Sequence, residues 1–155
     1  MTTTLTLEDR IQRIEDRAEI SSLAVRYAMA IDAHDWAGLA ALFTEEVQLD
    51  FSEAGLPAQS MTRDQFAAFS EQGLGGWGRL QHLSPNHVVD FDEQDPNSAR
   101  LTSYMFAQHH TEGEPPFVMH GSYDHDVVRT PDGWKIAALT QHLFWMDNPP
   151  AAMQR

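Results

Sequence analysis

The sequence contains no cysteine, few basic residues and no long apolar run. The first absence excludes disulfide bonds, thiolate metal sites and cysteine nucleophiles. Ten lysines and arginines stand against 23 aspartates and glutamates, and the net charge of −13 argues against nucleic acid or an anionic membrane surface as a partner. No run is long enough to span a bilayer, and the start, MTTTLTLEDR, lacks the basic and apolar regions of a signal peptide. We therefore expect a cytoplasmic protein.

What is present is the composition of one globular domain. The chain has 155 residues, 42% of them apolar, which suffices for a single domain over 1–155 with a core over about 8–148. Eight histidines is a high number for this length, and seven of them lie after residue 80. We therefore expect the C-terminal half to carry polar groups that line a site.

The stretch from Tyr27 to Phe43 reads as the end of a long helix, a break and a short second helix. Upstream of the break, apolar residues recur at steps of three and four, which predicts the buried face of the long helix. These residues are Leu7, Ile11, Ile14, Ala18, Ser21, Val25 and Ala28. The solvent-facing side is expected to carry Asp9, Gln12, Arg13, Asp16 and Glu19.

The next position in the apolar series is Asp32. A carboxylate on a buried stripe, close to a helix C-terminus, is unfavourable for two separate reasons, and such exceptions are typical of functional sites. The alternative role for Asp32 is to cap the second helix. Asp35 is better placed for that purpose, because it directly precedes Trp36.

The remaining pattern predicts helices before strands. Helices are expected over about 8–31, 36–43 and 62–72, the last opened by a capping box from Thr62 to Gln65. Alternating apolar residues predict one strand near 47–51 and long strands over about 80–91, 98–110, 116–129 and 133–146. This order indicates an α+β fold, in which long N-terminal helices pack on a curved, mainly antiparallel sheet that wraps into a cone. The concave side of such a sheet is the default place for a ligand.

Three kinds of chemistry fit this pattern unequally. An aspartate–histidine pair can move a proton near neutral pH, and Asp32 with His82 or His110 fits that role, although a lone histidine on a strand is more often structural. His109 and His110 are adjacent and point to opposite faces of a strand, so we expect no metal site. No G-x-S-x-G or phosphate-loop motif favours nucleophilic catalysis or nucleotide binding. Alternation alone does not tell which strand face points inward.

Three motifs resemble those of SnoaL-like proteins, a group within the nuclear transport factor 2-like superfamily. They are Y-x-x-x-x-D-x-x-D-W from Tyr27, Q-H-L-S-x-N from Gln81 and R-T-x-D-G-W-K-I from Arg129. The resemblance spans about residues 10–148, and the chain looks most similar to scytalone dehydratase and bile-acid 7α-dehydratase. It implies a cone-shaped α+β barrel and a reaction that needs no cofactor. It is weakly specific for the reaction, because this fold hosts many activities.

The resemblance also implies particular site residues. Asp32 matches the acidic residue that follows the long helix in these lyases, and His82 matches its partner histidine. The residues implied to bind the substrate are Tyr27, His110, Ser122, Asp124 and Phe51. Phe51 stands where scytalone dehydratase has a tyrosine that polarises the substrate carbonyl, so scytalone itself is not the expected substrate.

Together, the residues and the resemblance predict a lyase of the dehydratase type. Its Asp32–His82 pair would abstract a proton from a small cyclic or polycyclic hydroxy-carbonyl compound. The alternatives are a ketosteroid-type isomerase, a polyketide cyclase, and a non-catalytic domain for small-molecule binding or dimerisation. A sheet face without helices would need to be buried, so we expect a homodimer or homotrimer.

Overall fold

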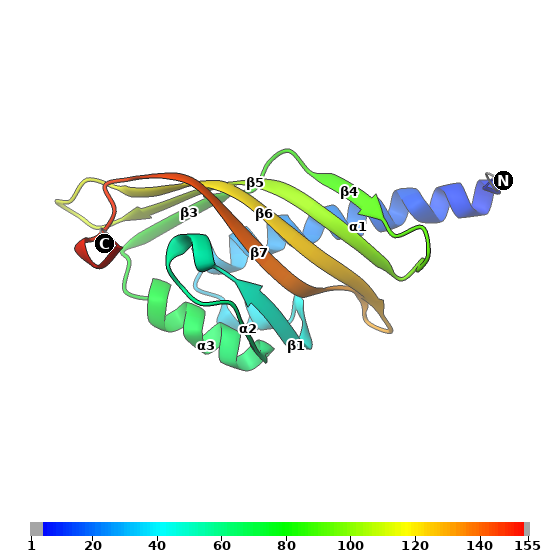
Figure 1. The fold of residues 1–155 in the computed structure, drawn as a ribbon, viewed down its shortest axis with the longest axis horizontal. Coiled ribbons are helices and arrows are strands. Elements are labelled where there is room, and N and C mark those ends of the chain that lie inside the picture. Colours follow the sequence, from blue (N-terminus) through cyan, green and yellow to red (C-terminus); the bar gives the residue numbers. More distant parts are fainter. Residues whose placement is uncertain (1–4, 154–155) are drawn as a thin grey trace.

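The computed structural model describes residues 5–153 (Figure 1). In chain order the elements are α1 (Leu7–Asp32), α2 (Trp36–Ala40), β1 (Phe43–Asp50), η1 (Ser52–Ala54), β2 (Gln59–Thr62), α3 (Arg63–Leu74), β3 (Arg79–Leu83), β4 (Val88–Phe91), β5 (Ser98–His110), β6 (Phe117–Thr130), β7 (Gly133–Asp147) and η2 (Ala151–Met153). No helix in this range is long and apolar enough to cross a membrane.

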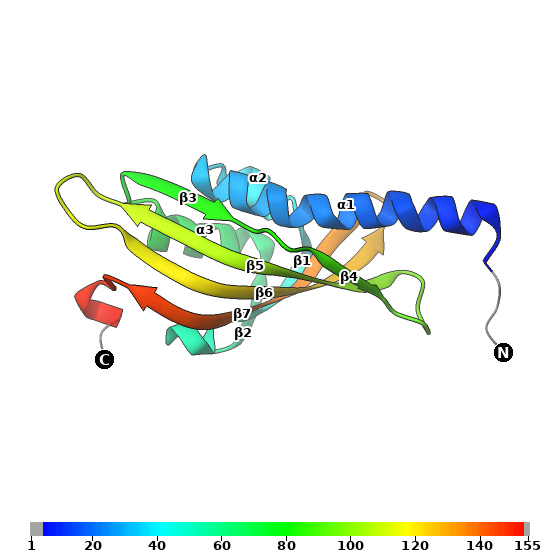
Figure 2. The same cartoon turned by 90° about the horizontal axis from the view of Figure 1, so that it is seen from above.

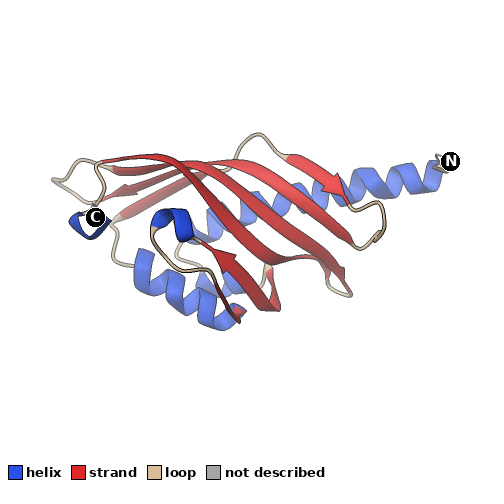
Figure 3. Ribbon diagram, in the orientation of Figure 1, coloured by secondary structure: helices blue, strands red, loops and turns tan. Residues whose placement is uncertain are grey.

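The strands form one curved, unclosed sheet in the order β2-β1-β7-β6-β5-β3, and β4 pairs with β5 beyond the end of β3. All of these pairings are antiparallel except that of β1 with β7. Figure 3 shows the long strands β5, β6 and β7 crossing in front of the helix α1. The predicted α+β fold, with helices packed on a curved and mainly antiparallel sheet, is confirmed.

The buried face of α1 differs from the predicted one. Ile20, Leu23, Tyr27 and Ile31 face the core, whereas Leu7 and Ile14 are 68% and 69% exposed. Figure 2 shows the reason at the N-terminal end, where α1 extends past the end of the sheet. Further along, Ala18 and Val25 are exposed as well, and of the predicted stripe only Ala28 is buried. The predicted stripe is therefore wrong along the whole helix, and the true stripe lies on a neighbouring face.

Asp16 was expected on the solvent-facing side but is only 5% exposed. It accepts hydrogen bonds from Arg129, from Trp134 Nε1 at 3.1 Å and from Gln12 Nε2 at 3.1 Å. Burial raises the pKa of Asp16, but these three donors together bring the pKa below its ordinary value. The cluster ties α1 to the hairpin that joins β6 and β7, and so fixes the direction in which the helix runs toward Asp32.

Most predicted boundaries are close to the observed ones. Asp35 caps α2 by accepting from the Gly38 N–H at 2.8 Å, and Thr62 forms the predicted capping box with Gln65. The strand predicted over 80–91 is split into β3 and β4. The split contains Asn86, whose φ of 62° interrupts the extended backbone.

Candidate active site

A cavity of about 370 Å³ lies on the concave side of the sheet. Its wall is mostly aromatic and aliphatic and comes from α1, α3, the inner faces of β3, β5, β6 and β7, and the segments that follow β1 and β7. The polar side chains in the wall are Tyr27, Ser70, His82, His109, Tyr123 and Gln141. No lysine, arginine, aspartate or glutamate lines it within residues 5–153. The cavity thus offers an apolar enclosure with a few neutral polar groups and one imidazole backed by a carboxylate.

Asp32 is the last residue of α1, and it reaches across to β3. Its carboxylate accepts the backbone N–H of His82 at 3.0 Å and 2.9 Å through its two oxygens, and the imidazole Nδ1 of His82 lies 2.7 Å from Oδ1. The side chain of His82 is 6% exposed and that of Asp32 is 26% exposed. The two residues therefore form a shielded pair 50 positions apart in sequence.

This contact decides which nitrogen of His82 carries the proton. A carboxylate only accepts hydrogen bonds, so Nδ1 carries a proton, and in the neutral ring Nε2 keeps a lone pair. His82 lines the cavity, and no described residue forms a hydrogen bond with Nε2. Nε2 is thus the atom available to take a proton from a molecule in the cavity, and Asp32 is positioned to stabilise the imidazolium that would result.

His109 is a second histidine in the cavity wall, and it is held neutral. Burial, and then the neighbouring His82, lower the pKa of His109 to about 4. Its ring stacks on Phe117 with centroids 4.8 Å apart, and it meets the His82 ring edge to face at 5.6 Å. Its Nδ1 lies 3.3 Å from the Phe117 carbonyl oxygen, so Nδ1 donates and Nε2 is an acceptor.

The structure places the expected binding residues in two groups. Tyr27 and Phe51 line the cavity, with exposed fractions of 4% and 9%. The side chains of His110, Ser122 and Asp124 lie on the opposite, outer face of the sheet, so their expected placement in the cavity is wrong. The reason is register: the odd-numbered residues of β5 and β6 point inward.

Asp124 has a different environment on that outer face. It accepts from Thr102 Oγ1 at 2.8 Å and lies 3.2 Å from His142 Nε2. His142 in turn lies 3.2 Å from Glu53 in η1. Asp124 thus belongs to a surface cluster of polar residues that has no contact with the cavity.

Three cavity residues, His109, Tyr123 and Gln141, were not predicted as site residues. The weak signal for them lies in the alternation of β5 and β6, where Leu101 and Met105 share a face with His109. Asp124 and Asp126, on the other hand, share a face with Ser122. Assigning the apolar set to the inside would have selected His109 over His110 and Tyr123 over Ser122.

Comparison with known proteins agrees with this architecture. The SnoaL-like domain family matches residues 12–140. An uncharacterized protein of Mycobacterium tuberculosis (strain H37Rv), Rv2910c, is 31% identical over 131 residues, which cover 81% of this chain and 84% of the relative.

Two solved structures from Novosphingobium aromaticivorans share the fold. One is a candidate scytalone dehydratase with a TM-score of 0.78 and 22% identity, covering 90% of this chain and 91% of that one. The other is a protein of the nuclear transport factor 2-like type with a TM-score of 0.75 and 22% identity, covering 99% of this chain and 97% of that one. The sequence match and the shared fold together show that the chain belongs to the SnoaL-like family, within the nuclear transport factor 2-like fold.

Proposed function

We propose that the protein is a cofactor-independent lyase of the dehydratase type. The observation that supports this most is the 2.7 Å contact between Asp32 and His82 Nδ1, because it leaves Nε2 of His82 as a base beside an apolar cavity. A positioned acid–base group of this kind contributes roughly 10²- to 10⁴-fold to a rate.

In the proposed reaction, His82 Nε2 takes a proton from a carbon next to a carbonyl group. The electron pair of the broken C–H bond forms a carbon–carbon double bond, and the C–O bond of a hydroxyl group on the next carbon breaks. The departing oxygen takes the proton back from the imidazolium and leaves as water, so His82 returns to its initial state. Asp32 keeps the ring oriented and balances its transient charge.

The cavity supports an uncharged cyclic or polycyclic hydroxy-carbonyl compound as the substrate. Its walls include Phe66, Phe69, Trp77 and Phe117, and its volume of about 370 Å³ is within the range of small-molecule sites. A buried carboxylate or phosphate on the substrate would be costly here, because no cationic side chain within residues 5–153 lines the wall.

Two other functions use the same cavity. An isomerase or a cyclase would return the proton to a different atom and lose no water. A binding domain would hold the ligand without turnover, and His82 would then tolerate replacement. The polarity of the wall does not separate these functions, so the products must be identified.

The test is incubation with a panel of cyclic hydroxy-ketones and steroids, read by the mass of the product. Loss of one water is expected, and the rate should fall by roughly 10²- to 10⁴-fold in Asp32→Asn. Asp35→Asn is the matched control, since asparagine also caps a helix and Asp35 lies outside the cavity wall. Full activity in Asp32→Asn would contradict the mechanism. A product of unchanged mass but altered chromatographic retention would identify an isomerase or cyclase. Binding of a compound without turnover would identify a binding domain.

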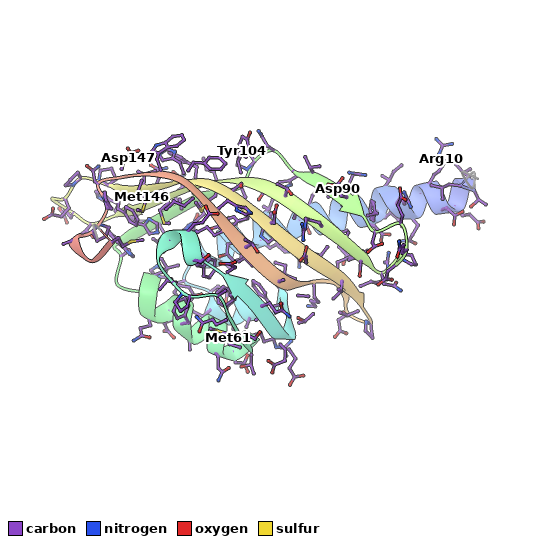
Figure 4. The ribbon with its side chains drawn as sticks, viewed as in Figure 1. Arg10, Met61, Asp90, Tyr104, Met146 and Asp147 are labelled. Carbon is purple, nitrogen blue, oxygen red and sulfur yellow. The ribbon has the colours of Figure 1, made fainter. Side chains whose placement is uncertain are left out.

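We further propose that the protein acts in the cytoplasm as a homodimer or homotrimer. Support for the assembly comes from the outer face of β5, β6 and β7, where Tyr104, Phe144 and Trp145 are 52%, 56% and 55% exposed. Figure 4 shows Tyr104 projecting away from the ribbon. Exposed aromatic side chains that gather on one face are typical of an interface.

A further inference from the structure

Two tyrosines and a glutamine form a polar group in the cavity wall that the proposed mechanism does not use. Tyr27 comes from α1, Tyr123 from β6 and Gln141 from β7. The Tyr27 and Tyr123 rings meet edge to face with centroids 5.7 Å apart. Gln141 Nε2 lies 3.4 Å from the Tyr123 oxygen and 3.2 Å from Met105 Sδ.

Counting the protons in this group shows that one donor is left over. Each phenol has one O–H to donate, and a bond between the two phenols would use only one of them. The amide N–H of Gln141 donates to Tyr123 and therefore accepts nothing there. At least one phenolic proton of this group, which lines the cavity, therefore has no acceptor among the described residues.

Both phenols stay protonated, so this donor persists throughout the physiological pH range. Burial raises the pKa of Tyr123 to about 12, and it raises the pKa of Tyr27 well above its ordinary value. A neutral O–H surrounded by apolar wall suits an uncharged acceptor such as a ketone, because an anion would lose its hydration without gaining a cation.

The strand that carries Tyr123 is not the one that carries His82. In the sheet, His82 of β3 pairs with Ala107 of β5, which pairs with Met119 of β6. Tyr123 is four residues beyond Met119 on the same strand. With strands about 4.8 Å apart and a rise of about 3.3 Å per residue, the two backbone positions differ by about 10 Å across the strands and about 13 Å along them. The phenol group and His82 therefore reach the one cavity from separate places in the sheet.

We propose that Tyr27, Tyr123 and Gln141 form a subsite that binds an uncharged oxygen acceptor of the substrate, separate from the Asp32–His82 pair. The phenols determine the specificity for the oxygen acceptor. Gln141 is a positioning residue, because its amide N–H donates to the Tyr123 oxygen. That the bound molecule is a substrate rests on the proposed lyase function. Binding at the subsite can be tested without turnover.

The test compares 9-fluorenone with fluorene, rigid tricyclic compounds that differ by one carbonyl group. Equilibrium dialysis gives the ratio of the two dissociation constants for each variant. Relative to wild type, the preference for the ketone should fall roughly 2- to 10-fold in the double variant Tyr27→Phe/Tyr123→Phe, as expected for one neutral hydrogen bond. Each single variant should retain part of it, because the remaining phenol still has a proton to donate.

Ser70→Ala is the matched control, since Ser70 is a buried hydroxyl in the same wall but belongs to α3. It should keep the wild-type ratio. The ratio is a measurement of binding, so failure of the lyase proposal would leave this result standing, and failure of the subsite would leave the lyase proposal standing. An unchanged ratio in the double variant, or an equal fall in Ser70→Ala, would overturn the proposal.

A second measurement uses the wild-type protein and does not depend on the double variant folding. The infrared carbonyl stretch of bound fluorenone should lie below its frequency in an apolar solvent, because a hydrogen bond weakens the C=O bond. A stretch at the apolar-solvent frequency would mean that no donor meets the carbonyl, and the subsite would be refuted.

Discussion

At the scale of single residues, the site depends on which groups donate hydrogen bonds to the Asp32 carboxylate. A carboxylate at a helix C-terminus is disfavoured by the helix dipole. Here it is compensated from another element, by the backbone N–H and the ring of His82. The sequence showed that Asp32 breaks a local rule, but the compensating partner becomes visible only when β3 lies beside the end of α1.

Two buried histidines make a measurable contribution to the pH dependence of stability. Burial lowers the pKa of His125 to about 4, as it does mainly for His109. Between their ordinary pKa of 6.5 and about 4, the unfolded chain binds more protons than the folded one, so stability falls as the pH falls. From pH 7 to pH 5 each residue should lower the free energy of unfolding by about 2 kcal/mol, measured by urea denaturation.

The variant His125→Gln isolates one of these contributions. Its loss of stability between pH 7 and pH 5 should be smaller than that of wild type by about 2 kcal/mol, whatever its stability at pH 7. Equal slopes in His125→Gln and wild type would show that His125 is not held neutral by the fold.

At the scale of elements, the sequence predicted which helices and strands exist, and in what order, better than it predicted which of their faces are buried. Three of the four predicted long strands, the capping box at Thr62 and the cap at Asp35 follow from local signals and are confirmed. The buried face of α1 was misassigned because the apolar residues Leu7, Ile11 and Ile14 lie where the helix has left the sheet, and they set a stripe that leads to the exposed Val25. Periodicity indicates which residues share a face, whereas burial depends on what the face meets.

The strands of the site show the same limit, because alternation groups side chains by face without telling which face points inward. Alternation correctly separated His109 from His110 and Tyr123 from Ser122, but it did not identify the inner set. The resemblance favoured His110, Ser122 and Asp124, each one position away from an inward-pointing residue. A shift of one residue moves a side chain to the other face of the sheet, so site residues on strands are the least transferable part of a resemblance.

At the scale of the whole molecule, no α-helix of residues 5–153 packs on one face of the sheet. In Figure 1 the strands β5, β6 and β7 lie in front of α1, and no α-helix of the described residues covers their near side. His120 stacks on Trp145 there with centroids 4.3 Å apart, and Tyr104 meets Phe144 edge to face. These aromatic residues form the surface that we expect a second copy of the chain to cover.

The expected result is that wild type elutes as a dimer or trimer in size-exclusion chromatography with light scattering, and that Trp145→Glu shifts the mass toward that of the monomer. A buried, unpaired carboxylate would oppose assembly at this face. Leu7→Glu is the control, because Leu7 is also exposed but lies on the projecting end of α1. A monomeric wild type, or dissociation by Leu7→Glu alone, would contradict the assignment of this face.

The central claim is that His82 is a base whose lone pair faces the cavity while Asp32 holds its other nitrogen. Long-range ¹H–¹⁵N correlation spectra of the unliganded protein test this directly, with His82→Gln to assign the ring signals. The neutral ring should be protonated at Nδ1 and unprotonated at Nε2. A neutral ring with its proton on Nε2 would contradict the account, because that nitrogen could then not accept a proton from a substrate.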